Sequence, residues 1–440
     1  MLQGHRAVLI QAPTGSGKTL LTAHMLDTAA RKGMGAWFIV HRRELVKQSI
    51  KAFHGEGIKY GVLASGFQED TRAAIQIASI QSLIHRYSRL RAPQMIVWDE
   101  AHHLAAGSWT RLFSSFPMAY HIGLTATPLR LDGSGLKKYF TSLILGPSVQ
   151  VLVQQGYLAP YRLFAPGGMD LKGLHSRMGD YIKSEAASAA DKPTITGNAI
   201  LEYKRHCAGK MAVVFCVSIE HSKHVVEQFR AAGIPSAHVD GETDVKERDA
   251  AIESFEAGRI KVLSNVELFG EGFDLPAIEV AILLRPTQSL GLYLQQVGRA
   301  LRPSPGKDTA FILDHAGNVL QHGLPDQDRE WSLAGAGDSH RSANAGAPVR
   351  ICPKCFAAQF PGSQVCKFCG TVFEVESREV EEVEGELSEV DLERLRKQRA
   401  VEVWKAKTRE EVEALARARG YKPGWVYHRM KILEARGQHG

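Results

Sequence analysis

Long apolar runs are missing from this 440-residue sequence, although 44% of its residues are hydrophobic. No stretch approaches the roughly 18 to 20 apolar residues of a membrane-spanning helix. The N-terminus has no secretory signal pattern, because glycines and Lys18 interrupt its apolar stretches. Cysteine is scarce too, with six in the chain and four of them between residues 352 and 369. These absences exclude a membrane protein and a disulfide-rich secreted scaffold, and they predict a reducing, cytoplasmic setting.

Apolar runs alternate with helix-length segments as far as about residue 320. A chain of this length is too long for one hydrophobic core, so two large domains are expected. Strands separated by helices predict an α/β fold with two tandem parallel-sheet domains. The expected strands form two series: 7–11, 36–40, 74–78, 94–98 and 121–124, then 211–217, 236–239, 260–264, 280–284 and 309–313.

Composition changes along the chain predict its division into segments. The last 110 residues differ from the α/β part, because they pass through Gly-, Ala- and Ser-rich, cysteine-containing, acidic and basic stretches in turn. Trp404, Leu415, Trp425 and Tyr427 are the expected packing positions of the basic end. The segments are two domains over 1–145 and 146–330, a flexible linker over 331–349, a cysteine module over 350–373, an acidic linker over 374–393 and a basic helical tail over 394–440.

A glycine-rich segment follows the first expected strand and opens a helix. It matches the pattern of a small residue, four residues of any kind, then Gly-Lys-Ser/Thr. Its glycines allow backbone N–H groups to surround a phosphate at a helix N-terminus. Lys18 can reach the β- and γ-phosphates, and the Thr19 hydroxyl can bind Mg²⁺. The predicted phosphate-binding residues are Ala12, Pro13, Thr14, Gly15, Ser16, Gly17, Lys18 and Thr19.

Two carboxylates, Asp99 and Glu100, end the apolar strand 94–98. In phosphate-loop ATPases an acid at this strand end holds the Mg²⁺ and a neighbouring residue orients the attacking water. Asp99 suits the first role and Glu100 the second. The alternative is a strand followed by a solvated acidic turn, which the phosphate loop upstream makes less attractive.

Asp-Glu-Ala-His at 99–102, after the Gly-Ser-Gly-Lys-Thr loop, resembles the superfamily-two helicases of the DEAH type. Segments resembling the other motifs of that family follow in order, over residues 1 to about 320. The Thr-Ala-Thr-Pro and Gly-Phe-Asp-Leu-Pro forms are most similar to the branch of restriction-enzyme motor subunits, excision-repair helicases and phage helicases. That branch acts mainly on DNA. The matching segments are 40–48, 78–83, 123–128, 265–276 and 295–303.

The resemblance implies two RecA-like domains with the ATP site in the cleft between them. Arg299 and Arg302, at i and i+3 of one helix, would stabilise charge on the transferred phosphoryl group. Gln295 would contact the nucleotide or its water, while Gly272 and Asp274 would line the cleft, with Asp274 near the ribose. The family also carries an adenine-gripping segment about twenty residues upstream of the phosphate loop. This sequence starts at Met1, so we expect a truncated N-terminus.

Cys352, Cys355, Cys366 and Cys369 form two Cys-x₂-Cys pairs separated by ten residues. Each pair presents two thiolates, and four thiolates suit a structural Zn²⁺. Two disulfides or an iron–sulfur cluster are the alternatives. The segment resembles zinc ribbons that contact nucleic acid or protein. Because the helicase motifs end before residue 304, we expect the motor to hydrolyse ATP without the ribbon.

The segment 417–431 interleaves basic residues with Tyr and Trp. Such a pattern can bind phosphates and stack on bases, or it can be the core of a small helical hairpin. With a net charge of +7, the sequence predicts an ATP-, Mg²⁺- and Zn²⁺-dependent helicase or translocase on nucleic acid, in particular DNA. The alternatives are a DNA-stimulated ATPase remodeller or nuclease motor subunit that does not unwind, and a zinc-dependent nucleic-acid-binding adaptor. The ribbon or tail can also hold a protein partner; the oligomeric state stays open.

Overall fold

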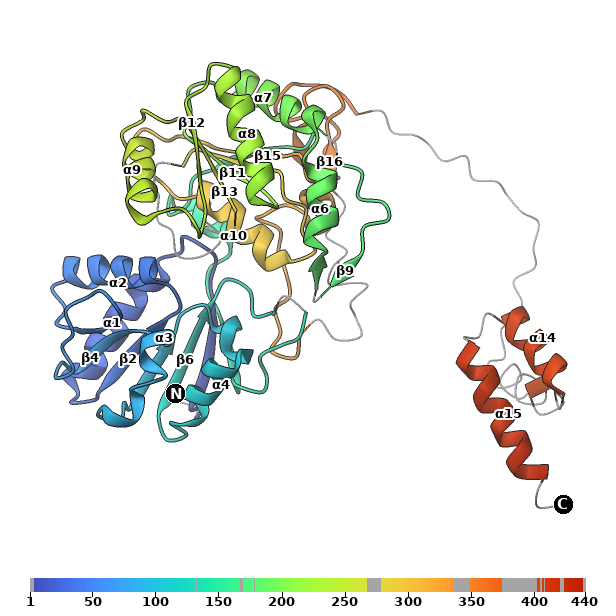
Figure 1. Ribbon diagram of the computed structural model, residues 1–440, viewed down its shortest axis with the longest axis horizontal. Helices are drawn as coiled ribbons and strands as arrows, with labels where there is room; N and C mark the ends of the chain where they lie inside the picture. The colour runs from blue at the N-terminus through green and yellow to red at the C-terminus, as the bar shows by residue number, and fades with distance from the viewer. Residues whose placement is uncertain are drawn as a thin grey trace. The chain divides into compact units, whose positions relative to one another are not determined.

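The computed structural model of the protein contains two parallel sheets, a small cysteine module and a helical tail (Figure 1). The chain divides into two compact units, Met1–Glu374 and Val375–Gly440, and each is described by itself. We call the part built on the first sheet the first lobe and the part built on the second sheet the second lobe. The described residues are 4–130, 133–166, 169–177, 179–266, 278–335, 349–373, 402–403, 406, 408–419 and 423–437.

The first lobe is a seven-stranded sheet in the order β3-β4-β2-β5-β6-β1-β7, with parallel pairing throughout. Helices α1 and α2 cover one face and α4 covers the other, with a hydrophobic core on each side. Burial on both faces explains why the strands read as continuous apolar runs. The elements are β1 (Ala7–Gln11), α1 (Lys18–Arg31), β2 (Ala36–Val40), α2 (Arg43–Gly55), β3 (Gly61–Leu63), β4 (Ile75–Ser79), α3 (Ile80–Leu83), η1 (Tyr87–Arg89), β5 (Met95–Trp98), η2 (Ala101–Ala105), α4 (Gly107–Ser114), β6 (Tyr120–Thr125) and β7 (Ser142–Leu145).

The second lobe is a six-stranded parallel sheet in the order β12-β13-β11-β14-β15-β8. Its two cores contain residues of α5, α9 and α10 on one face and of α7 and α8 on the other. The elements are α5 (Val149–Gln154), β8 (Tyr161–Phe164), β9 (Ser176–Arg177), β10 (Asp180–Tyr181), α6 (Lys183–Ala190), α7 (Pro193–Cys207), β11 (Ala212–Phe215), α8 (Ile219–Ala231), β12 (Ser236–Val239), α9 (Val245–Glu256), β13 (Val262–Asn265), β14 (Val280–Leu283), α10 (Leu290–Ala300), β15 (Ala310–Asp314) and α11 (Asn318–His322).

Both predicted sheets are confirmed, and every expected strand is present with its ends within two residues of the prediction. Three further strands of the two large sheets, β3, β7 and β8, were not expected from the sequence. All three lie at sheet edges. Each overlaps an apolar run of only three residues, at 62–64, 143–145 and 163–165, so its sequence lacks the long apolar run that reveals a central strand.

The chain returns from the second lobe to the first through residues 325–335, which we call the strap. Leu333 packs against the first-lobe core, and its carbonyl accepts a hydrogen bond of 2.9 Å from the amide of Lys137. Ser134 and Gly335 form an antiparallel bridge. The lobes are therefore joined by the strap as well as by the segment after β7. Part of the expected linker, residues 331–335, is thus held on the first lobe, and residues 336–348 lie outside the described part.

The cysteine module packs on the second lobe. Its strands β16 (Arg350–Ile351) and β17 (Ala358–Gln359) pair with each other, and Ala357 bridges to Phe164 of the edge strand β8. The amide of Ala165 donates to the carbonyl of Phe356 over 2.9 Å. This docking differs from the expectation of a module kept apart by a linker, and it covers a sheet edge that would otherwise be open.

The tail forms two helices, α14 (Arg409–Arg419) and α15 (Pro423–Gly437), which pack together. Val412 and Ala416 are buried. Tyr427 is 66% exposed, so it is not the core residue that the helical-hairpin alternative expected. Trp404 and the acidic segment 374–393 lie outside the described residues. No helix in the described part of the chain is long and apolar enough to cross a membrane.

Candidate ATP site and zinc centre

The phosphate loop connects β1 to α1, as the sequence predicts. Gly15 and Gly17 have φ values of 85° and 79°, which a residue with a Cβ adopts only with strain. Helix α1 begins at Lys18, directly after Gly17. The loop therefore lies at the N-terminus of a helix, where unbonded N–H groups favour an anion.

Lys18 folds back over this loop. Its Nζ donates to the carbonyls of Ala12 and Pro13, each over 2.9 Å. Burial lowers the pKa of Lys18, and the nearby carboxylates of Glu100 and Asp99 oppose this shift. Arriving phosphates would replace the carbonyls as partners of the ammonium group.

Asp99 and Glu100 follow β5 at the carboxyl edge of the sheet. Asp99 is only 8% exposed, and burial next to Glu100 raises the pKa of Asp99 to about 7. Glu100 has a φ of 47°, an unusual conformation for a non-glycine residue that turns the chain sharply out of the strand. A buried carboxylate with little compensation suits a cation, so the residues fit the Mg²⁺ that the sequence implies.

His102 connects these carboxylates to the segment 123–128. Its Nδ1 lies 3.4 Å from Oε2 of Glu100 and 3.3 Å from Oγ1 of Thr125. The Thr125 hydroxyl in turn donates to the carbonyl of Thr127 over 2.7 Å. A change at the acidic residues can therefore reach Thr127, which faces the second lobe.

Helix α10 brings the second lobe to the phosphate loop. A Cβ on Gly298 would lie 2.7 Å from Cβ of Thr14, and one on Gly291 would lie 2.8 Å from Oγ1 of Thr127. The two glycines are two helical turns apart, so they lie on one face of α10. The sequence analysis did not identify this close approach, because a glycine within a helix shows nothing of its neighbours.

Of the two predicted arginines, Arg299 lies within α10, whereas Arg302 lies two residues beyond its end, so they do not share one helix as expected. Arg299 and Gln295 are each 5% exposed. The stem of Arg302 lies 3.5 Å from the position that a Cβ on Gly15 would take. Both arginines lower the pKa of Lys18, whereas the two carboxylates raise it. The structure thus brings Lys18, Asp99, Glu100, Arg299 and Arg302 together; Gly272 and Asp274 lie in 267–277, outside the described residues.

A cavity of about 240 Å³ lies beside the Thr14–Gly298 contact. One wall is the apolar side of α10, and the strap contributes another. The sequence analysis gave no sign of this cavity, because its walls come from segments that are far apart in the chain. Its lining includes Gln11, Thr14, Pro147, Leu294, Val297, Leu301, Arg329 and Trp331.

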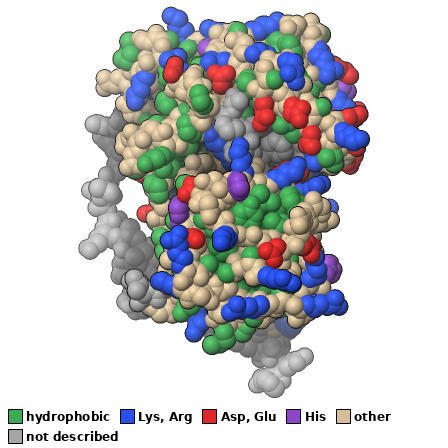
Figure 2. All heavy atoms as spheres, turned by 90° about the vertical axis from the view of Figure 1, so that its left-hand side faces the viewer, with side chains coloured by type: hydrophobic (Ala, Val, Ile, Leu, Met, Phe, Trp, Pro, Cys, Tyr) green, Lys and Arg blue, Asp and Glu red, His purple; other side chains and the backbone are tan. Residues whose placement is uncertain are grey.

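The predicted nucleic-acid segments 40–48 and 78–83 lie at the carboxyl ends of neighbouring strands β2 and β4. Nε2 of Gln81 donates to the carbonyl of His41 over 2.7 Å and so links the two segments. On the side where α2 and α9 lie, Lys, Arg and His side chains gather along a hollow between the halves of the molecule (Figure 2). Arg248 of α9 and Glu44 of α2 form a 3.3 Å ion pair across the lobes.

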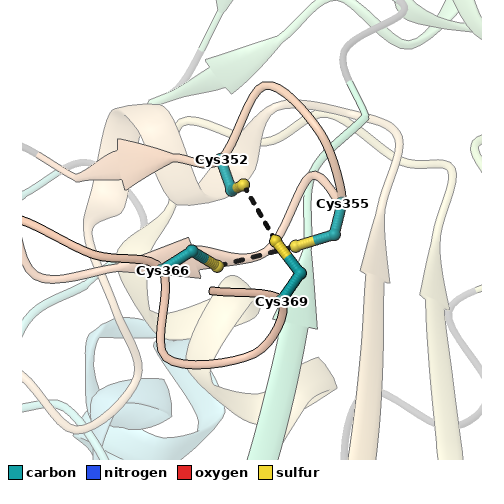
Figure 3. A group of neighbouring side chains, drawn as sticks. All are labelled: Cys352, Cys355, Cys366 and Cys369. Carbon is teal, nitrogen blue, oxygen red and sulfur yellow. Dashed lines mark hydrogen bonds between the residues drawn. The ribbon is translucent and has the colours of Figure 1, made fainter. Parts of the chain in front are cut away.

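The four predicted zinc ligands converge on one point (Figure 3). Sγ of Cys352 lies 3.6 Å from Sγ of Cys369, and Sγ of Cys355 lies 3.7 Å from Sγ of Cys366. Four sulfurs at about 2.3 Å from one Zn²⁺ would lie about 3.8 Å apart, so the arrangement fits the ion. The hydroxyl of Thr371 lies 3.1 Å from Sγ of Cys369 and lowers the pKa of that thiol to about 6, which favours the metal-binding thiolate.

Each cysteine pair is followed by a residue with a left-handed backbone conformation. Phe356 after Cys355 has a φ of 60°, and Gly370 after Cys369 has a φ of 72°. In both turns the amide of this residue donates to the carbonyl of the first cysteine, over 2.9 Å. Gly370 adopts this conformation without a side chain to oppose it, whereas Phe356 adopts it with one.

Two family models match the chain. One is described as the res subunit of a type III restriction enzyme and matches residues 1–130. The other is described as the helicase conserved C-terminal domain and matches residues 195–304. The first match contains the phosphate loop and both carboxylates, and the second contains α10 and both arginines.

Individual proteins are similar over longer stretches. The chain is 34% identical over 391 residues to a 51.5 kDa protein of a Lactococcus phage, covering 88% of this chain and 83% of that protein. It is 29% identical to the proposed mitochondrial ATP-dependent helicase irc3 of Schizosaccharomyces pombe, covering 73% and 56%. It is 24% identical to the DNA 3′–5′ translocase XPB2 of Sulfurisphaera tokodaii, covering 67% and 74%.

Among solved structures, a fragment of a proposed HsdR subunit of a type I restriction enzyme from Vibrio vulnificus is similar, with a TM-score of 0.57. It is 25% identical, and the match covers 72% of this chain and 61% of that one. The match, which covers 72% of this chain, is about as long as the two lobes together. The chain spans little more than half the length of the fungal protein and of this fragment.

Proposed function

Because the chain belongs to the superfamily-two helicases, in the branch of restriction-enzyme motors and excision-repair helicases, we propose that it couples ATP hydrolysis between its lobes to movement along DNA. The observation that carries this proposal is the convergence of groups from both lobes on the phosphate loop. Asp99 and Glu100 come from the first lobe and the two arginines from the second, and all four act on Lys18. Closure of the lobes then completes the site.

Each residue has a distinct task in this reaction. Lys18 and the loop amides bind the phosphates, and Thr19 and Asp99 would hold the Mg²⁺. That ion, when bound, neutralises phosphate charge. Glu100 orients the attacking water, while Arg299 and Arg302 stabilise charge on the γ-phosphate. Gln295 contacts the nucleotide or its water.

DNA is the proposed track. A relative is named as a DNA 3′–5′ translocase, and other similar proteins are named as restriction-enzyme subunits. The segment at the carboxyl end of β2 supplies exposed cations, including Arg43 and Lys47 on one face of α2. Phosphate contacts from such cations bind a strand regardless of its sequence.

The direct test compares ATP turnover with single-stranded DNA, duplex DNA, forked DNA and RNA. We expect DNA to stimulate turnover and Glu100→Gln to bind ATP but to retain it unhydrolysed, because the water loses its orienting carboxylate. Glu220→Gln, on an exposed position of α8, is the matched control. Normal turnover by Glu100→Gln would remove the proposed role of Glu100. Strand displacement beside displacement of a protein block then separates unwinding from translocation alone.

We also propose one Zn²⁺ per chain, held by the four thiolates. The sulfur separations near 3.7 Å support this, as does the absence of disulfides among the six cysteines, which are all free. Metal analysis of the purified protein should find zinc in a 1:1 ratio. Iron with inorganic sulfide, or two disulfides by mass spectrometry, would contradict the proposal.

A further inference from the structure

A partly buried lysine outside every helicase motif lies against the end of α10. Lys307 follows Ser304-Pro305-Gly306, and its amide donates to the carbonyl of Ser304 over 3.1 Å. Gly306 has a φ of 79°. Proline at the second position and a left-handed glycine at the third are the signature of a type II turn. This turn reverses the chain after α10 and returns Lys307 to the helix end.

The ammonium group of Lys307 contacts three backbone carbonyls. Nζ donates over 2.6 Å to the carbonyl of Ile278 and over 2.6 Å to that of Arg302. It also donates to the carbonyl of Ala300. A lysine has three N–H donors, so these contacts use all of them.

Ala300 is the last residue of α10, where a helix leaves carbonyls without partners and attracts a cation, and Arg302 lies two residues beyond the helix. The third belongs to Ile278, which leads into β14. Lys307 therefore links the end of α10 to the chain that enters β14. Arg302 is held by its own backbone carbonyl, while its stem lies beside Gly15 of the phosphate loop.

Holding a lysine in this place is costly, because burial lowers the pKa of Lys307 to about 8. Glu279 opposes this shift, while Arg302 and Lys210 add to it. A hydrophobic side chain of similar length would avoid that cost. The contacts with the carbonyls give a reason for a lysine here that packing alone does not.

We propose that Lys307 is a positioning residue for Arg302, fixing the backbone from which that guanidinium reaches the phosphates. The inference rests on the proposed function of Arg302. Without Lys307 the last turn of α10 loses its cap, and the guanidinium is no longer held in one place. A misplacement of about 1 Å at a catalytic group can cost on the order of 10²-fold in rate.

The test is a double-mutant cycle in the full-length protein. We expect Lys307→Met to lower kcat for ATP about 10- to 100-fold while KM changes less than about twofold. In an Arg302→Ala background the same substitution should lower kcat by less than about twofold, since the group that it positions is gone. Lys204→Met, in the last turn of α7 with an exposed side chain, is the control and should leave kcat unchanged.

Multiplicative losses in the double variant would overturn the inference, because a general structural defect lowers kcat whether or not Arg302 is present. If Arg302→Ala alone keeps full turnover, the proposed role of Arg302 fails and this inference fails with it. Should Lys307→Met not fold, Lys307→Gln takes its place in the cycle, since its shorter side chain and two donors cannot satisfy all three carbonyls. Unchanged kcat in Lys307→Gln would also count against the proposal.

Discussion

Two glycines of α10 set how closely the second lobe approaches the first. At Gly298 a single methyl group would overlap Thr14, and at Gly291 it would approach Thr127. Both contacts lie next to the residues that complete the ATP site. Small side chains are therefore as important there as the arginines, because they determine whether the arginines can reach the phosphates.

Gly298→Ala should lower ATP turnover at least about tenfold, since the added Cβ would lie 2.7 Å from Thr14 and would keep the lobes apart. The fold should survive, because alanine stabilises a helix relative to glycine by about 1 kcal/mol. Gly197→Ala is the matched control, as a Cβ at this position of α7 meets no atom within 4 Å. Turnover and thermal unfolding of both variants decide the matter; a fully active Gly298→Ala would show that the contact does not limit closure.

His315 should make the protein less stable in acid. Burial lowers the pKa of its imidazole to about 4, and neither ring nitrogen has a hydrogen-bond partner among the described residues. An unfolded histidine titrates near pH 6.5, so the unfolded chain binds more protons between about pH 6.5 and 4. The contribution to stability is full above pH 6.5 and is lost as the pH falls toward 4.

Between pH 7 and pH 5 the free energy of unfolding should therefore fall by about 2 kcal/mol less in His315→Leu than in the unsubstituted protein. Urea unfolding of both proteins at each pH measures this difference. The raised pKa of the neighbouring Asp314, about 6, has the opposite effect on stability, but it is common to both proteins and cancels. An equal loss of stability in both proteins would mean that His315 is not neutral in the folded state.

At the scale of whole elements, the strap and the cysteine module each pack on a lobe and extend its hydrophobic core. The strap adds Leu333 to the first-lobe core. The ribbon adds Cys352, Cys366 and Phe373 to a core of the second lobe. Neither role is visible from the composition of the segment, which reads as a linker or as an independent module.

Gly135→Ala should release the strap, since a Cβ there would lie 2.1 Å from the carbonyl oxygen of Leu333. The amide of Lys137, which donates to that carbonyl, should then exchange its hydrogen faster with solvent. Gly107→Ala is the control, because no atom lies within 4 Å of its added Cβ. Equal protection of Lys137 in both variants would show that the strap does not depend on this contact.

Removal of zinc should destabilise the second lobe and lower ATP turnover, in contrast to the expectation from the sequence that the motor is independent of the ribbon. The reason is the docking of the ribbon on β8, through Phe356 and Ala357. Thermal unfolding with and without a chelator measures the effect, and added zinc should reverse it. An unchanged melting temperature, with the metal shown to be gone, would mean that the ribbon adds no stability to the lobe.

At the scale of the whole molecule, positive charge lies in two parts of the chain. Residues 394–440 contain thirteen Lys and Arg and five Glu, a net charge of +8. The acidic segment 374–393 contains ten Asp and Glu and one Arg, so residues 1–373 must also carry +8 to give the total of +7. The tail thus holds in 47 residues the net charge that the lobes and the cysteine module hold in 373, which makes it a dense source of sequence-independent attraction to a polyanion.

Truncation after residue 393 keeps the strap, the cysteine module and the acidic segment but removes the thirteen cations of the tail. We expect weaker DNA binding with a shallower dependence on salt, since fewer counterions are released, and basal ATP turnover should persist. Titrations of labelled single-stranded DNA at several salt concentrations test this. An unchanged affinity and slope would assign DNA binding to the lobes alone and would favour a protein partner for the tail.

The sequence by itself determined the central strands, the phosphate loop, the acidic pair at 99–100 and the cysteine ligands. These features are local: a buried parallel strand must be apolar along its length, and a phosphate loop needs glycine and lysine at fixed spacing. The edge strands β3, β7 and β8 were not predicted because an apolar run of three residues is too short to show that pattern. Only the tertiary structure decided that Gly298 meets Thr14, that Lys307 caps α10 and that the ribbon covers β8. Each of these depends on contact between segments far apart in the chain, which no local pattern encodes.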